Sequence, residues 1–132
     1  MKKLIISIVV MLATSVALSA QVEKMLGKWT TIDDKTHQAV SVVEIYKADN
    51  GLYYGKLVEM LVEGEDGLVG TMIIKDMEFK KGALQGGRVY DPDSGNTYYG
   101  TVKIDAKTGD LILRGSLDKA GLLGRSQTWK RR

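Results

Sequence analysis

The chain contains no cysteine, a single histidine and a single proline. Without cysteine it has neither disulfides nor a site for lipid attachment at an N-terminal cysteine, so its stability must come from the packed core alone. The histidine, His37, lies in a polar stretch that predicts a loop, where it is poorly placed to act as the base of a Ser-His-acid triad. Zinc, copper and haem sites draw mainly on His and Cys ligands, so we expect none of these metals and no cofactor.

The first twenty residues have the three parts of a secretory signal peptide. Lys2 and Lys3 form a basic start, residues 4–12 are almost wholly apolar, and small residues follow up to Ala20. We therefore predict a signal peptide over residues 1–20, a mature chain beginning at Ala20 or Gln21, and export to the periplasm or the cell exterior. The apolar run is shorter than the about 20 residues of a membrane span, so an uncleaved anchor is the less favoured alternative.

Neither sign of charge is in large excess once the leader is set aside. The whole chain has 19 basic and 16 acidic side chains, and two of the lysines but none of the acids lie in the leader. The mature chain therefore carries 17 basic against 16 acidic side chains, a formal charge of +1. A nucleic-acid-binding domain needs a broad basic surface, so no nucleic-acid partner is expected.

Residues 21–132 have room for one domain, and strand-forming segments recur along them. Turn-forming clusters of Gly, Asn and Asp separate these segments, and short connections favour antiparallel neighbours. An acidic stretch at 62–70 predicts a solvated loop or lid, and residues 22–26 predict a brief helical turn. The pattern predicts an all-β fold, an eight-stranded antiparallel up-and-down barrel. Its expected strands are residues 27–32, 40–47, 52–61, 71–79, 83–90, 97–105, 110–117 and 123–131.

Several glycines lie inside the expected strands, among them Gly55 and Gly100. Such glycines weaken a flat sheet but permit the sharp bends that a closed barrel needs. Closure also removes exposed sheet edges, so we expect the first strand to pair with the last. Bends are predicted at Gly55 and Gly100, and a valine at Gly100 is expected to destabilise the fold through its backbone angles.

Alternation along the last strand selects candidate site residues. It places Arg125, Gln127 and Trp129 on the face that is predicted to point into the barrel. An inward arginine needs an acid, an aromatic ring, water or a ligand anion as its partner. Two roles are therefore open for Arg125: a latch stacked on Trp29 at a closed end, which we favour, or an anchor for an acidic ligand.

Five segments carry a family resemblance: residues 27–31 (Gly-Lys-Trp-Thr-Thr), 43–46, 54–58, 86–92 (Gly-Gly-Arg-Val-Tyr-Asp-Pro) and 123–129 (Leu-Gly-Arg-Ser-Gln-Thr-Trp). Together they resemble an uncharacterised family of exported bacterial proteins, domain of unknown function 2147, which has no established activity. More loosely, a Gly-x-Trp on the first strand with an arginine on the last resembles lipocalin and avidin-type barrels, in which that tryptophan closes one end. This second resemblance implies a lipocalin-like barrel.

Three classes of function are open. The first is a binding protein that holds a small, partly apolar molecule, because eight strands enclose space for side chains or for one small ligand. The second is an envelope protein with a filled barrel, whose surface or acidic loop contacts another protein. Six residues are the candidates for lining or closing a ligand site: Trp29, Arg88, Tyr90, Arg125, Gln127 and Trp129.

The third class, a hydrolase, is the least favoured. It would need two facing carboxylates, and the candidates are expected to point mostly into solvent; they are Glu44, Glu59, Glu63, Asp76 and Glu78. A calcium ion held by Asp91, Asp93, Ser94 and Asn96 is an alternative to a plain β-turn. The turn is preferred, because the spacing lacks the twelve-residue calcium-loop pattern.

Overall fold

The computed structural model describes residues 20–132, and the predicted signal peptide lies outside the described residues apart from Ala20. Residues 20–23 are helical, slightly before the predicted turn, and a short 3-10 helix, η1 (Asp66–Leu68), lies in the predicted acidic loop. Within this part of the chain no helix is long and apolar enough to span a membrane. The strands are β1 (Gly27–Ile32), β2 (Ala39–Lys47), β3 (Tyr53–Met60), β4 (Met72–Lys80), β5 (Ala83–Asp91), β6 (Asn96–Ile104), β7 (Leu111–Ser116) and β8 (Gly124–Arg131).

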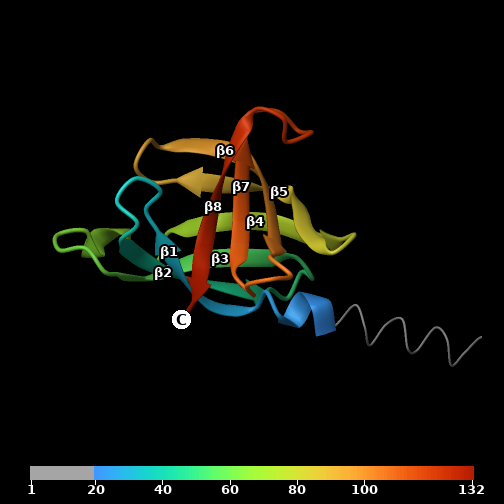
Figure 1. Ribbon diagram of the computed structural model, residues 1–132, viewed down its shortest axis with the longest axis horizontal. Helices are drawn as coiled ribbons and strands as arrows, with labels where there is room; N and C mark the ends of the chain where they lie inside the picture. The colour runs from blue at the N-terminus through green and yellow to red at the C-terminus, as the bar shows by residue number, and fades with distance from the viewer. Residues whose placement is uncertain (1–19) are drawn as a thin grey trace, which may run out of the picture.

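The eight strands form one closed barrel in sequence order, and every neighbouring pair is antiparallel (Figure 1). The ring closes where β1 meets β8, with Trp29 opposite Arg131 and Thr30 opposite Lys130. Each strand begins and ends within one residue of its predicted bounds. The prediction of an up-and-down barrel, lipocalin-like in its closure, is confirmed.

An up-and-down path sends alternate connections to opposite ends of the barrel. We call the end with the β1–β2, β3–β4, β5–β6 and β7–β8 loops the open end. The end with the other three connections and the helical segment before β1 is the closed end. Figure 1 shows the β1–β2, β3–β4 and β5–β6 loops on the left, opposite the β4–β5 hairpin and the short helix.

Inward-facing side chains from all of the strands form one apolar cluster. Alternation explains it, because successive residues of a strand point to opposite faces of the sheet. Along β2 the buried positions include Ser41, Val43 and Ile45, and the intervening Glu44 is only partly buried. Met25, from the turn before β1, joins the cluster at the closed end.

The two strand glycines predicted to mark bends differ in their role. At Gly55 the pairing of β3 with β4 changes register, as expected for a bend. Gly100 pairs regularly with Gly115 and does not have a positive φ. A Cβ atom at Gly100 would lie 2.3 Å from Val89 Cγ2 and 2.7 Å from Met77 Cε. Valine is therefore excluded there by packing, and the predicted cause, unusual backbone angles, was wrong.

Candidate functional site

The closed end is built around Trp29, which is only 1% exposed. Its indole Nε1–H donates to the carbonyl oxygen of Met25 at 2.9 Å, which fixes the turn before β1 across the end of the barrel. A buried indole needs a hydrogen-bond acceptor for this N–H group, and here the backbone supplies it. Trp29 thus closes one end, as the lipocalin resemblance implied.

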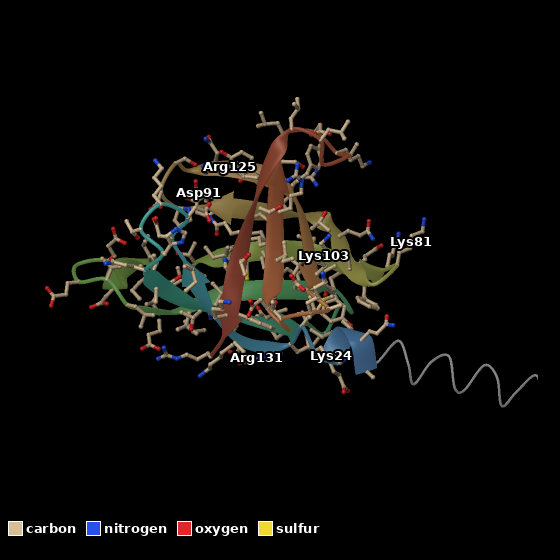
Figure 2. The ribbon with its side chains drawn as sticks, viewed as in Figure 1. Lys24, Lys81, Asp91, Lys103, Arg125 and Arg131 are labelled. Atoms are coloured by element: carbon tan, nitrogen blue, oxygen red, sulfur yellow. The ribbon has the colours of Figure 1, made fainter. Side chains whose placement is uncertain are left out.

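The arginine that stacks on Trp29 is Arg131, and the prediction that Arg125 would do so was wrong. The guanidinium carbon of Arg131 lies 3.9 Å from the centre of the Trp29 ring. Its nitrogens also donate to the carbonyl oxygens of Leu26, at 2.7 Å, and of Lys24. By alternation both arginines lie on the same face of β8, but Arg125 is exposed and six residues away, roughly 20 Å along an extended strand. Figure 2 shows Arg131 beside Lys24 at the closed end and Arg125 at the far end with Asp91.

The open half of the barrel is hollow. A cavity of about 710 Å³ extends from the mouth into the barrel and is lined by 26 residues. This volume lies within the range of about 300–1,000 Å³ typical of small-molecule sites. Its deep walls are apolar: Val43, Leu57, Ile73, Val89, Leu113 and Trp129. The interior is therefore filled with side chains only in the closed half of the barrel.

Three polar side chains lie among these apolar walls. The hydroxyls of Thr31 and Ser41 share a hydrogen bond of 2.7 Å, in which either can be the donor. Gln127 Oε1 accepts a hydrogen bond of 3.2 Å from the indole N–H of Trp129. Because an indole N–H only donates, this contact orients the amide, and it leaves the NH₂ group of Gln127 as a donor for a ligand.

Charged side chains line the mouth of the cavity, and most of them are acidic. The acidic ones are Asp33, Glu65, Asp91 and Asp93, and the basic one is Arg125. The backbone N–H groups of Thr36 and Lys35 donate to Asp33 Oδ1 at 2.9 and 2.8 Å and lower the pKa of its carboxyl. Within residues 20–132 neither Arg125 nor these four acids form an ion pair.

The β7–β8 loop holds three leucines at the mouth, largely in solvent. Leu117, Leu122 and Leu123 are 71%, 80% and 67% exposed, and all three also line the cavity. The loop is nevertheless tightly organised. The backbone N–H groups of Leu123 and Leu122 donate to the Asp118 carboxylate at 2.6 and 2.9 Å, which lowers the pKa of Asp118. Arg114 Nε, from β7, donates to the carbonyl oxygen of Gly121 at 2.7 Å.

Four of the six candidate residues meet in the cavity lining: Tyr90, Arg125, Gln127 and Trp129. Trp29 lies beyond the cavity, at the closed end. Arg88 is exposed on the barrel surface, with its guanidinium carbon 4.2 Å from the centre of the Tyr99 ring. The alternation of β8 therefore predicted the lining residues of that strand, whereas of the two candidates in the family motif 86–92 only Tyr90 reaches the cavity.

The five carboxylates considered for hydrolysis do not meet in the described structure. Glu59 pairs with Arg132, Glu78 with Lys80, and Asp76 accepts a hydrogen bond from Tyr54. None of the five belongs to the cavity lining, as far as residues 20–132 show. In the loop considered for calcium, Asp91 accepts from the Asp93 backbone at 3.0 Å and from the Ser94 hydroxyl at 2.9 Å, so its oxygens serve the turn.

Sequence reasoning did not predict that acids from different loops meet at the mouth. The signal was available, because alternate loops of an up-and-down barrel must share one end. Asp33, Glu65 and Asp93 each lie in one of those alternate loops, and Asp91 ends the strand before the third loop. Considered loop by loop, they look like ordinary turn residues.

Comparison with solved structures finds a similar barrel in protein HP1028 from the human pathogen Helicobacter pylori, which is described as belonging to the lipocalin family. The two chains are 24% identical, with a TM-score of 0.62 over 81% of this chain and 82% of the other, so the likeness concerns the fold. No curated protein matches the chain. Residues 27–131 match the family described as "Uncharacterized protein conserved in bacteria (DUF2147)". The chain therefore belongs to the DUF2147 family of bacterial proteins.

Proposed function

We propose that this protein is an exported binding protein that holds a small, partly apolar molecule in the open half of its barrel. The observation that carries the proposal is the cavity of about 710 Å³, whose deep wall is apolar and whose charged groups lie at the mouth. Apolar walls with a small number of oriented polar groups are typical of ligand sites in β-barrels. The lipocalin description of the Helicobacter pylori protein supports the same class of function.

Within the site, Trp129 and Leu113 would contact the apolar body of the ligand. Gln127 is the main polar anchor, because its amide is already oriented by Trp129 and retains free donors. Export is inferred from the basic, apolar and small-residue succession in residues 1–20. Sequencing the N-terminus of the protein from the cell envelope tests that part; an intact Met1 in a cytoplasmic pool would contradict it.

Two tryptophan substitutions on β7 test the ligand site. Leu113→Trp adds bulk inside the cavity, whereas Ile112→Trp adds the same bulk on the opposite face of the same strand. The neutral fluorescent probe N-phenyl-1-naphthylamine, excited directly, reports binding. We expect the parent and Ile112→Trp to bind it similarly and Leu113→Trp to lose about tenfold in affinity or more, a change of about 1.4 kcal/mol.

Circular dichroism and thermal melting would verify that both variants are folded. A parent protein that does not bind the probe, or equal affinities of the two folded variants, would contradict the proposal. If Leu113→Trp does not fold, Gln127→Leu, which removes a polar group but keeps most of the side-chain volume, gives a second test, with altered affinity for polar derivatives of the probe expected.

A further inference from the structure

The acidic side chains of this protein are concentrated around the mouth of the cavity. The four loops at the open end, residues 33–38, 61–71, 92–95 and 117–123, contain seven acidic side chains and only two lysines. The mature chain as a whole has 17 basic and 16 acidic side chains, so this local excess is not a property of its composition. The charge asymmetry therefore coincides with the entrance to an apolar cavity.

Four of the mouth residues that line the cavity itself are carboxylates, and one is a guanidinium. Asp33 and Asp91 are partly buried, and the backbone hydrogen bonds to Asp33 favour its ionised form by lowering its pKa. No lysine or arginine within residues 20–132 neutralises any of the four in an ion pair. The mouth thus keeps a net negative charge. The apolar walls beside it have a low dielectric constant and screen this charge only weakly.

We propose that the cavity selects amphiphiles with a cationic end group, such as an alkylammonium. The apolar body would occupy the space between Leu57, Leu113 and Trp129, and the cation would remain at the mouth among Asp33, Asp91 and Glu65. A cleft with charge of one sign and low-dielectric walls concentrates counter-ions and speeds their association. This inference rests on the proposed function and adds the charge of the ligand.

Arg125 supports the opposite selectivity, because a carboxylate ligand would find one guanidinium near Gln127. That carboxylate would at the same time approach four acids, and like charges at short range repel each other. Because the four acids outnumber Arg125, the net charge at the mouth favours a cationic ligand. Arg125 then acts against the bound cation, so its removal is expected to strengthen cation binding.

Three ligands with the same ten-carbon chain separate these cases: decylamine, decanol and decanoate. Each is titrated against bound N-phenyl-1-naphthylamine at neutral pH, below its micelle concentration. We expect decylamine to bind most tightly and decanoate least, with about a tenfold difference between the two at low salt and a smaller one at high salt. Arg125→Ala is expected to raise the affinity for decylamine and lower that for decanoate.

A pair of double variants shows whether the mouth is responsible. Glu65→Gln/Asp93→Asn removes two exposed charges at the mouth, and Glu23→Gln/Asp49→Asn removes two charges at the closed end. We expect the first pair to reduce the affinity for decylamine severalfold and leave decanol unchanged, and the second pair to change neither. Decanoate binding as tightly as decylamine, or equal effects of the two double variants, would overturn the inference while leaving the ligand site intact. Failure of all three compounds to bind would instead refute the proposed function.

Discussion

Two arginines on the same face of β8 have opposite surroundings. At the closed end Arg131 stacks on Trp29 and donates to two backbone carbonyl oxygens. At the open end Arg125 lines a cavity and forms no ion pair within the described residues. One half of the barrel thus fills its interior and satisfies its polar groups, and the other half leaves both space and unpaired charge. We infer that the barrel is divided in function, with stability residing mainly at the closed end and binding at the open end.

Replacing the tryptophan of the closed end should have the largest effect. Trp29→Ala removes a side chain that is 1% exposed, and truncations of buried aromatic residues cost about 3–5 kcal/mol. Tyr90→Ala at the mouth removes a partly buried ring that lines the cavity, so a cost below about 1.5 kcal/mol is expected. Urea unfolding of both variants measures the two costs. Equal destabilisation would show that the two ends contribute alike.

The two arginines give a smaller but more direct comparison. Arg131→Ala should lower the free energy of unfolding by about 1–2 kcal/mol, because it removes a cation–π contact and two hydrogen bonds to exposed backbone. Arg125→Ala should change it by less than about 0.5 kcal/mol. Arg131→Lys should restore little, because an ammonium lacks the planar fork that stacks and donates together. If Arg131→Ala lost probe binding at temperatures where the variant is still folded, the separation of stability at the closed end from binding at the open end would be contradicted.

The smallest effect is expected from the loop that holds the exposed leucines. The pKa of Asp118 is lowered by the backbone N–H groups of Leu123 and Leu122, so its carboxylate stabilises the folded loop. This contribution to the stability of the folded protein is present in full above the pKa of Asp118 in the unfolded chain, about 4. It is lost as the pH falls through the lower pKa of Asp118 in the folded protein. Asp118→Asn should therefore melt slightly below the parent at neutral pH, with the difference vanishing in acid. Thermal melts against pH, with amide exchange at Leu122 and Leu123, provide the measurement; a constant difference down to acid pH would argue against it.

The fold was predictable because its signals are local. Turn residues mark the connections, and a period of two identifies the inward face of each strand. That period identifies the face on which a side chain lies but not its position along the barrel axis. For this reason the sequence favoured Arg125 as the arginine stacked on Trp29, although Arg131 occupies that place. The position along the axis depends on the register between β1 and β8, which places Trp29 opposite Arg131. Nothing in either segment alone encodes that register.

The cavity was not predictable for a related reason. Its volume depends on the sizes of facing side chains and on the bends that position them. Gly100 and Gly115 are strand glycines that pair with each other. Gly115 lines the cavity, whereas the space beside Gly100 is occupied by the side chains of Val89 and Met77. The sequence shows two similar residues, and only the three-dimensional packing tells which of them leaves space.

The pairing of β1 with β8 also constrains how the chain reaches its folded state. Trp29 and Arg131 are far apart in sequence, and every other strand lies between them. Contacts of such long range are slow to form, because the entropy of the whole intervening loop is lost before they stabilise anything. Until β8 docks, β1 and β7 present open edges, which are available for pairing with other chains. A nascent chain whose β8 is still inside the ribosome therefore lacks the strand that closes the ring, and the complete cavity forms only when this last strand is added.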